Sequence, residues 1–289
     1  MGFALLILTI ILIYVVEWVL PYKILQMSRR HSTNNPTSIG LRFDSLSVTT
    51  NDGYKLDGWW VYPNTEKAVG TILLVHGARS LKEYFLYNGV LEGLVGLGLN
   101  VVAFDNRAHG KSEGQYCTFG YYEQTDVTKI IDLIKAKTPQ LPLGIWGHSL
   151  GGTISILTLA KDKRVEFGVI ESTFSNLRET VSDYKRRLIG FSIPIVANRV
   201  LNNAGQVAQF EPDAIQPLER MKEIQQPVFI AHGTLDDKIK VQYAHELFGA
   251  LQSEQKYLHI IPNAKHSGLW RAGGQAYQEK VLGFIQSQL

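Results

Sequence analysis

The chain has 289 residues, of which 45% are apolar and 19% are charged, and its formal net charge is only +3. A chain of this length and composition can bury a large core, and α/β folds of this size commonly form one domain. The small net charge, with no dense run of basic residues between aromatic ones, argues against nucleic-acid binding.

The first apolar segment of the chain covers residues 2–20. At a rise of 1.5 Å per residue, a helix of this length crosses a hydrocarbon core of about 30 Å, so we predict a single-pass membrane anchor over residues 1–22. No basic residue precedes Lys23 and no Ala-x-Ala-like step follows the run, which disfavours a cleaved signal peptide. Lys23, Arg29 and Arg30 flank its C-terminal side, and the positive-inside rule then predicts a cytoplasmic domain. A helix that packs on the domain, or that is removed, is the alternative.

A polar, proline-containing linker is expected over residues 23–40, followed by one folded domain over residues 41–289. Residues 41–50 and 54–62 flank an Asn-Asp-Gly turn and predict a β-hairpin. From residue 71 onward, short apolar runs alternate with longer amphipathic stretches, which is the pattern of a parallel sheet covered by helices on both faces. The apolar runs are residues 71–76, 100–105, 143–146, 165–170, 227–231 and 257–261.

A serine follows the third of these runs, within the sequence Gly-His-Ser-Leu-Gly at residues 147–151. On a sharp strand-to-helix turn a serine adopts a strained backbone, which requires small residues two positions before and after it. Gly147 and Gly151 meet this requirement. The following helix offers its N-terminal N–H groups to a developing oxyanion. The pattern therefore predicts that Ser149 is a nucleophile.

A serine hydroxyl is a weak nucleophile, so it needs a base and an acid that orients the base. Asp236 lies in the loop after residues 227–231, and His266 lies in the polar loop after residues 257–261. Ligands of open α/β sheets bind beyond the carboxyl ends of the strands, where both loops and Ser149 are expected to meet. We therefore predict His266 as the general base and Asp236 as the orienting acid.

Other residues could fill the same two roles. Four histidines lie beside a glycine or beside the serine, where a strand-end turn is more common than a base. They are His76, His109, His148 and His232. For the acid, Asp237 is adjacent to Asp236, and Glu171 follows the run at residues 165–170. The chain order and the loop placement favour Asp236 and His266.

Three further polar residues are expected to be structural. Asp105 and Arg107 are predicted to form a turn-locking set of hydrogen bonds and ion pairs, because an Arg fork satisfies several acceptors at once. Cys117 lacks a glycine elbow, and a single cysteine excludes thiolate zinc sites and an intrachain disulfide framework. The chain has no phosphate-binding glycine motif and no H-E-x-x-H pattern. We therefore expect neither a cofactor nor a metal.

Four motifs in this order resemble those of the α/β-hydrolase fold. Residues 73–77 are similar to the third strand running into the oxyanion loop, and residues 104–112 are similar to the D-x-R-x-x-G-x-S turn after the fourth strand. The serine turn and the H-G-x-x-D acid loop at residues 232–236 complete the set, in the Ser, Asp, His chain order of this fold. That acid loop, with residues 214–218 upstream, most resembles the Bem46-like and serine-aminopeptidase-like hydrolases.

The resemblance implies a mostly parallel, eight-stranded sheet with helices on both faces. It also implies an oxyanion hole formed by the backbone N–H groups of Ala78 and Leu150. The implied activity is hydrolysis of a carboxylic ester or thioester through an acyl-enzyme, with no cofactor. An aminopeptidase-like activity and transfer to an acceptor other than water are alternatives. A membrane-tethered binding protein without catalysis is the alternative from another class.

The segment at residues 174–211 is longer than one helical crossover needs and contains an apolar stretch at residues 188–197. We predict a small lid insertion there. Lids of this fold shape the acyl or leaving-group pocket, so an apolar lid beside a membrane anchor favours a small-molecule or lipid-like acyl substrate. The sequence leaves the oligomeric state open.

Overall fold

The computed structural model describes residues 2–27, 29–189 and 193–289. Residues 190–192, which belong to the predicted lid, and residue 28 of the predicted linker lie outside the described residues, as does residue 1 of the predicted anchor.

The centre of the molecule is one eight-stranded sheet with the strand order β1-β2-β4-β3-β5-β6-β7-β8. Its strands are β1 (Phe43–Thr49), β2 (Lys55–Val61), β3 (Gly70–Val75), β4 (Leu99–Phe104), β5 (Leu143–His148), β6 (Phe167–Glu171), β7 (Val228–Gly233) and β8 (Lys256–Ile261). β2 pairs antiparallel with β1 and with β4, and all the other neighbouring pairs are parallel. The predicted fold, a mostly parallel eight-stranded sheet, is therefore confirmed.

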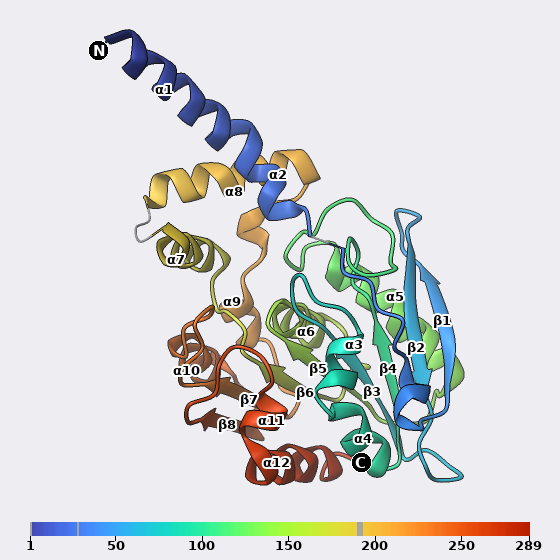
Figure 1. The fold of residues 1–289 in the computed structure, drawn as a ribbon. Coiled ribbons are helices and arrows are strands. Elements are labelled where there is room, and N and C mark those ends of the chain that lie inside the picture. The colour runs from blue at the N-terminus through green and yellow to red at the C-terminus, as the bar shows by residue number, and fades with distance from the viewer. Residues whose placement is uncertain (1, 28, 190–192) are drawn as a thin grey trace.

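Helices cover both faces of this sheet because its strands carry apolar side chains on both sides (Figure 1). In β3, Ile72 and Leu74 belong to one buried core, and Leu73 and Val75 belong to the other. The first core includes α3 (Glu83–Tyr87), α4 (Val90–Gly96), α11 (Leu269–Ala272) and α12 (Gly274–Gln286). The second includes α5 (Glu123–Lys137), α6 (Leu150–Lys161), α9 (Pro217–Met221) and α10 (Gln242–Ala250).

Two helices lie in the segment predicted to be a lid. They are α7 (Leu177–Ile189) and α8 (Pro194–Ala208), and a short 3₁₀ turn, η3 (Pro212–Ala214), leads back toward the sheet. Both helices lie on the side of the domain from which the N-terminal helix projects (Figure 1). We refer to α7 and α8 as the cap.

The N-terminal helix is continuous through α1 (Gly2–Tyr14), a π-helical turn η1 (Val15–Val19) and α2 (Leu20–Leu25). Within the described residues it is the one helix long and apolar enough to cross a membrane, over Phe3–Leu25. Its first half extends away from the domain (Figure 1). Its last residue, Leu25, is fully buried in a cluster with Phe174 and Leu201. The helix therefore ends inside the domain and is part of its core.

The segment after the helix is also held to the domain. The Arg29 guanidinium donates hydrogen bonds to the carbonyls of Gly110, Ser112 and Gly114. A 3₁₀ turn, η2 (Pro36–Ile39), then leads into β1. Two residues of the predicted linker, Leu25 and Arg29, therefore contact the domain.

Glu17 joins the N-terminal helix to the cap. Its carboxylate accepts two hydrogen bonds of 2.8 Å from Arg199 and one of 2.8 Å from Asn203, both on α8. Pro21 has no N–H to donate to the Glu17 carbonyl one turn earlier, and the Asn203 amide donates to that carbonyl at 3.4 Å. The π-helical turn lies at this same point. The interruption of the helix therefore coincides with its contact to α8.

Candidate active site

Ser149 lies at the turn from β5 to α6 with φ 55° and ψ −121°, which is a strained conformation for a residue other than glycine. A Cβ atom added to Gly147 would lie 2.1 Å from the Gly151 carbonyl oxygen. One added to Gly151 would lie 1.9 Å from the Val75 carbonyl oxygen. Backbone atoms cannot move away as a side chain can, so this turn requires glycine at both positions. The Ser149 N–H donates to the Glu171 carbonyl at 2.8 Å, which fixes the turn on β6.

The structure brings the three predicted side chains into one hydrogen-bonded chain. His266 Nε2 lies 2.9 Å from Ser149 Oγ, and His266 Nδ1 lies 2.8 Å from Asp236 Oδ2. The carboxylate can only accept, so Nδ1 carries the proton and Nε2 is free to accept the serine proton. This arrangement can move a proton from the serine hydroxyl to the imidazole.

Asp236 is held by four donors. Its Oδ1 accepts the N–H groups of Lys238 at 2.8 Å and of Ile239 at 2.9 Å. Its Oδ2 accepts from His266 and lies 3.0 Å from His232 Nε2. Burial alone would raise the pKa of Asp236, but the hydrogen bonds from His232 and His266 outweigh it and hold the pKa well below its ordinary value. The acid therefore stays charged while it orients His266.

The His266 ring packs against other aromatic rings. Its centroid lies 5.2 Å from that of His148, which in turn stacks on Tyr84 at 4.6 Å. The Tyr84 hydroxyl accepts the N–H of Gly268 at 3.2 Å, so it also fixes the loop that carries His266. Burial lowers the pKa of His266, and the Asp236 hydrogen bond only partly offsets this effect. His266 therefore stays neutral, and able to act as a base, down to a lower pH than a solvent-exposed histidine does.

The alternative acids lie elsewhere. Glu171 is buried, and its carboxylate accepts a hydrogen bond of 2.5 Å from the Tyr277 hydroxyl and lies 3.7 Å from His148 Nδ1. Asp237 is exposed at the surface. Asp236 is hydrogen-bonded to His266 Nδ1.

The loop after β3 packs against the serine turn and contains the predicted donor Ala78. A Cβ atom added to Gly77 would lie 3.0 Å from the Cβ of Ser149, which shows how closely the loop approaches. Leu150 is the first residue of α6, where helix N–H groups have no intrahelical acceptor. No hydrogen bond from either the Ala78 or the Leu150 N–H is found within the described residues. Both donors are thus available for an oxyanion.

Two buried histidines brace this loop. His76 Nε2 accepts the Asn106 N–H at 2.9 Å, and His109 Nε2 accepts the Arg79 N–H at 3.1 Å. Burial lowers the pKa of both rings, so both remain neutral acceptors. The positions of these two histidines beside glycine predict only strand-end turns, whereas their hydrogen bonds connect the loops after β3 and β4.

Asp105 and Arg107 are both structural, but they do not pair with each other as predicted. The buried Lys82 ammonium lies 2.7 Å from Asp105 and 2.7 Å from Asp57. Arg107 instead pairs with Asp126 at 2.6 Å and with Asp52 at 3.0 Å. Asp105 binds the Lys82 ammonium and Arg107 binds two carboxylates, so each side chain pairs with a residue outside the turn.

Within the described residues, no group of three or more His, Cys, Asp or Glu side chains is placed to hold a metal ion. Cys117 is buried and free, and burial raises the pKa of its thiol well above the ordinary value. It is therefore a packing residue, far from the thiolate form that a nucleophile requires.

The strand order and the serine turn, with its glycines and the helix behind it, define this protein as an α/β hydrolase. Residues 66–215, more than half of the chain, match the family model described as serine aminopeptidase, S33. The chain belongs to that family.

Related proteins agree with this assignment. The chain is 28% identical over 246 residues to the uncharacterized protein YqkD of Bacillus subtilis, covering 81% of this chain and 76% of the relative. It is 26% identical over 251 residues to monoglyceride lipase of Mus musculus, covering 76% and 82%. Among solved structures, the Pyrococcus furiosus esterase Pf2001 superposes with a TM-score of 0.77 at 25% identity, covering 92% of this chain and 99% of that one.

Proposed function

We propose that this protein is a membrane-anchored serine hydrolase that cleaves carboxylic ester or thioester bonds. The observation that carries this proposal is the pair of hydrogen bonds that links three side chains. Ser149 Oγ lies 2.9 Å from His266 Nε2, and His266 Nδ1 lies 2.8 Å from Asp236 Oδ2. Geometry of this kind activates a serine for acyl transfer. Relatives named as a lipase and an esterase support an ester substrate.

In the proposed reaction His266 Nε2 takes the proton of Ser149 as Oγ attacks the substrate carbonyl. The N–H groups of Ala78 and Leu150 hold the oxyanion, and Asp236 stabilises the imidazolium. His266 then returns its proton to the leaving alcohol or thiol, which leaves an acyl-serine. Water, deprotonated by the same imidazole, releases the acid. The reaction needs no cofactor.

The proposal of a membrane location rests on the predominantly apolar N-terminal helix, whose 23 residues, Phe3–Leu25, span about 34 Å at 1.5 Å per residue. Exposed apolar side chains at the start of α8, Ile193 and Ile195, extend this apolar surface onto the cap. A lipid-like substrate fits such a location. We propose a cytoplasmic domain, which protease protection of a C-terminal tag in sealed vesicles would test.

The second candidate is an aminopeptidase-like activity, which the description of the matching family favours. The two candidates share the same nucleophile and differ in the bond that is cleaved. A panel of ester and aminoacyl-anilide substrates therefore separates them.

The test is hydrolysis of p-nitrophenyl esters from acetate to palmitate by the full-length protein in detergent. Ser149→Ala should lower kcat/KM by at least about a thousandfold, because the nucleophile is lost. Ser287→Ala, near the C-terminus, is the matched control and should retain activity. Full activity in Ser149→Ala would refute the proposal, and cleavage of anilides but not esters by the wild type would favour the peptidase.

A further inference from the structure

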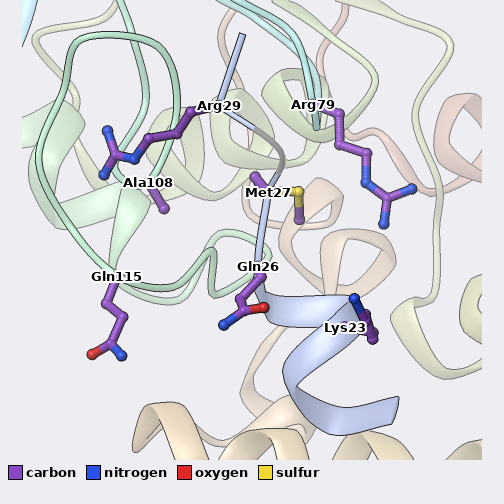
Figure 2. A pocket seen from close by; sticks show the side chains of 7 residues that line it. All are labelled: Lys23, Gln26, Met27, Arg29, Arg79, Ala108 and Gln115. Carbon is purple, nitrogen blue, oxygen red and sulfur yellow. The ribbon is translucent and has the colours of Figure 1, made fainter. Parts of the chain in front are cut away.

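An open cavity of about 510 Å³ lies between the end of the N-terminal helix and the loop after β3 (Figure 2). It is lined by Lys23, Gln26, Met27, Arg29, Arg79, Ala108 and Gln115. Three of these residues are cationic, two carry amides and none is acidic. A concave site with this composition has a positive potential and favours an anionic ligand.

The three cationic side chains differ in the hydrogen bonds that they already make within the protein. The Arg29 guanidinium already donates hydrogen bonds to the carbonyls of Gly110, Ser112 and Gly114. For the charged ends of Lys23 and Arg79, no hydrogen bond or ion pair is found in the part of the chain that the structure describes. Figure 2 shows both directed into the same part of the cavity. Two like charges that face one space repel each other until an anion lies between them.

Arg79 is tied to the reaction centre by its position in the chain. It directly follows the proposed oxyanion donor Ala78, and its φ of 56° lies in the left-handed region that few residues other than glycine adopt. The His109 ring, by accepting the Arg79 N–H, holds this conformation. Consecutive Cα atoms are 3.8 Å apart, so the Arg79 Cα lies within about 8 Å of the Gly77 Cα. Gly77 is beside the serine, since a Cβ atom added to it would lie 3.0 Å from the Cβ of Ser149. An anion in this cavity is therefore within reach of an ester bound at Ser149.

Lys23 relates the same cavity to the membrane. It lies at the C-terminal end of the apolar helix, where headgroup phosphates are found if that helix spans a bilayer. Arg and Lys together match a phosphate, since the guanidinium forms two parallel hydrogen bonds and the ammonium adds a point charge.

We propose that Lys23 and Arg79 bind the phosphate group of an acyl-ester substrate, so that the substrate is a single-chain phospholipid. This inference rests on the proposed hydrolase activity. It assigns the cavity to the substrate's own phosphate, in contrast to a neighbouring lipid headgroup or free phosphate.

The experiment compares two substrates with one acyl chain, 1-oleoylglycerol and 1-oleoylglycerol 3-phosphate, using the full-length protein in uncharged detergent micelles. The measured quantity is the ratio of kcat/KM for the phosphate-bearing ester to that for the neutral ester. Arg79→Gln and Lys23→Gln should each lower this ratio at least about tenfold, because each removes a charge-assisted contact to phosphate. Lys163→Gln, which removes an exposed charge in the turn between α6 and β6, at the amino end of β6, should leave it unchanged.

Two further arms separate the sources of phosphate. An unchanged ratio in both variants would overturn the inference, even if Arg79→Gln weakened binding to phosphatidic acid vesicles, because the cavity would then hold a bystander headgroup. Inhibition of neutral-ester hydrolysis by inorganic phosphate, with an unchanged ratio, would also overturn it and indicate a free-phosphate site.

Failure of the hydrolase proposal can be distinguished from failure of this inference. If the wild type cleaves neither ester, calorimetric titration with glycerol 3-phosphate tests whether the cavity binds a phosphate group. Binding that Arg79→Gln abolishes would support the phosphate site although the hydrolase proposal fails. No binding by the wild type would overturn the site as well.

Discussion

At the scale of single residues, the protonation of His266 determines the pH range of the proposed reaction. The base must be neutral to accept the Ser149 proton, so kcat/KM should rise with pH and then reach a plateau. Because burial lowers the pKa of His266, the midpoint of this rise should lie below about 6.5, the ordinary value for histidine. Rates measured from pH 4.5 to 8 check this expectation.

A matched variant tests the origin of that midpoint. The Asp236 carboxylate raises the pKa of His266 against the effect of burial, so Asp236→Asn should move the midpoint to lower pH. It should also reduce kcat by about 10⁴-fold, since the amide can favour the wrong tautomer of the imidazole. A midpoint above 6.5 in the wild type, or no shift in the variant, would contradict the assignment.

The contacts around Asp236 and His266 also show what could not be read from residue types. The order of Ser149, Asp236 and His266 was predictable because each follows a strand in a short motif. His148 and Tyr84 carry no such signal for their contacts, because these contacts join different strands, helices and loops. His232 lies four residues before Asp236 in the same loop motif and 3.0 Å from its carboxylate, whereas only the packed structure places His148 on His266.

At the scale of elements, the turn from β5 to α6 has the strictest local requirement. Gly147→Ala would place a methyl group 2.1 Å from a backbone oxygen, so the turn must shift, and we expect a loss of at least about 3 kcal/mol in the free energy of unfolding. The control is Gly249→Ala in α10, where a Cβ atom meets nothing within 4 Å. This control should gain up to about 1 kcal/mol from helix propensity. Denaturant unfolding of both variants tests the difference, and similar stabilities would contradict it.

The strands were more predictable than the helices that surround them. All eight strand segments could be predicted from the sequence. Buried parallel strands are continuous apolar runs, and the two strands of the hairpin flank a recognisable turn sequence. The π-helical turn η1 was not predicted, and it coincides with a contact of Glu17 with α8 that joins residues far apart in the chain. The partners of Asp105 and Arg107 were likewise set by side chains from other elements.

At the scale of the whole molecule, the N-terminal helix has two parts with different roles. Removal of residues 1–14 deletes the exposed α1 but keeps Glu17, Leu25 and Arg29, so the melting temperature should change little. Removal of residues 1–30 uncovers the cluster around Phe174 and Leu201. Loss of the Leu25 side chain alone costs about 1.5–3 kcal/mol, so we expect a decrease of several degrees or aggregation.

Calorimetry of the two truncated proteins, with full-length protein in detergent as the reference, checks this prediction. The same preparations test the proposed anchor, because both truncated forms should leave the membrane fraction while the full-length protein stays in it. Equal melting temperatures for the two truncations would show that Leu25 and Arg29 add nothing to the domain.

The sequence by itself determined the chain order of the motifs, the glycine-flanked serine and the apolar helix. These features are local, because each depends on hydrophobic periodicity or on the conformations allowed to a few adjacent residues. Only the tertiary structure decided the partners of Lys82 and Arg107, the attachment of Glu17 to the cap, and the cavity between Lys23 and Arg79. Those features join residues far apart in the chain, and their geometry follows from how complete elements pack.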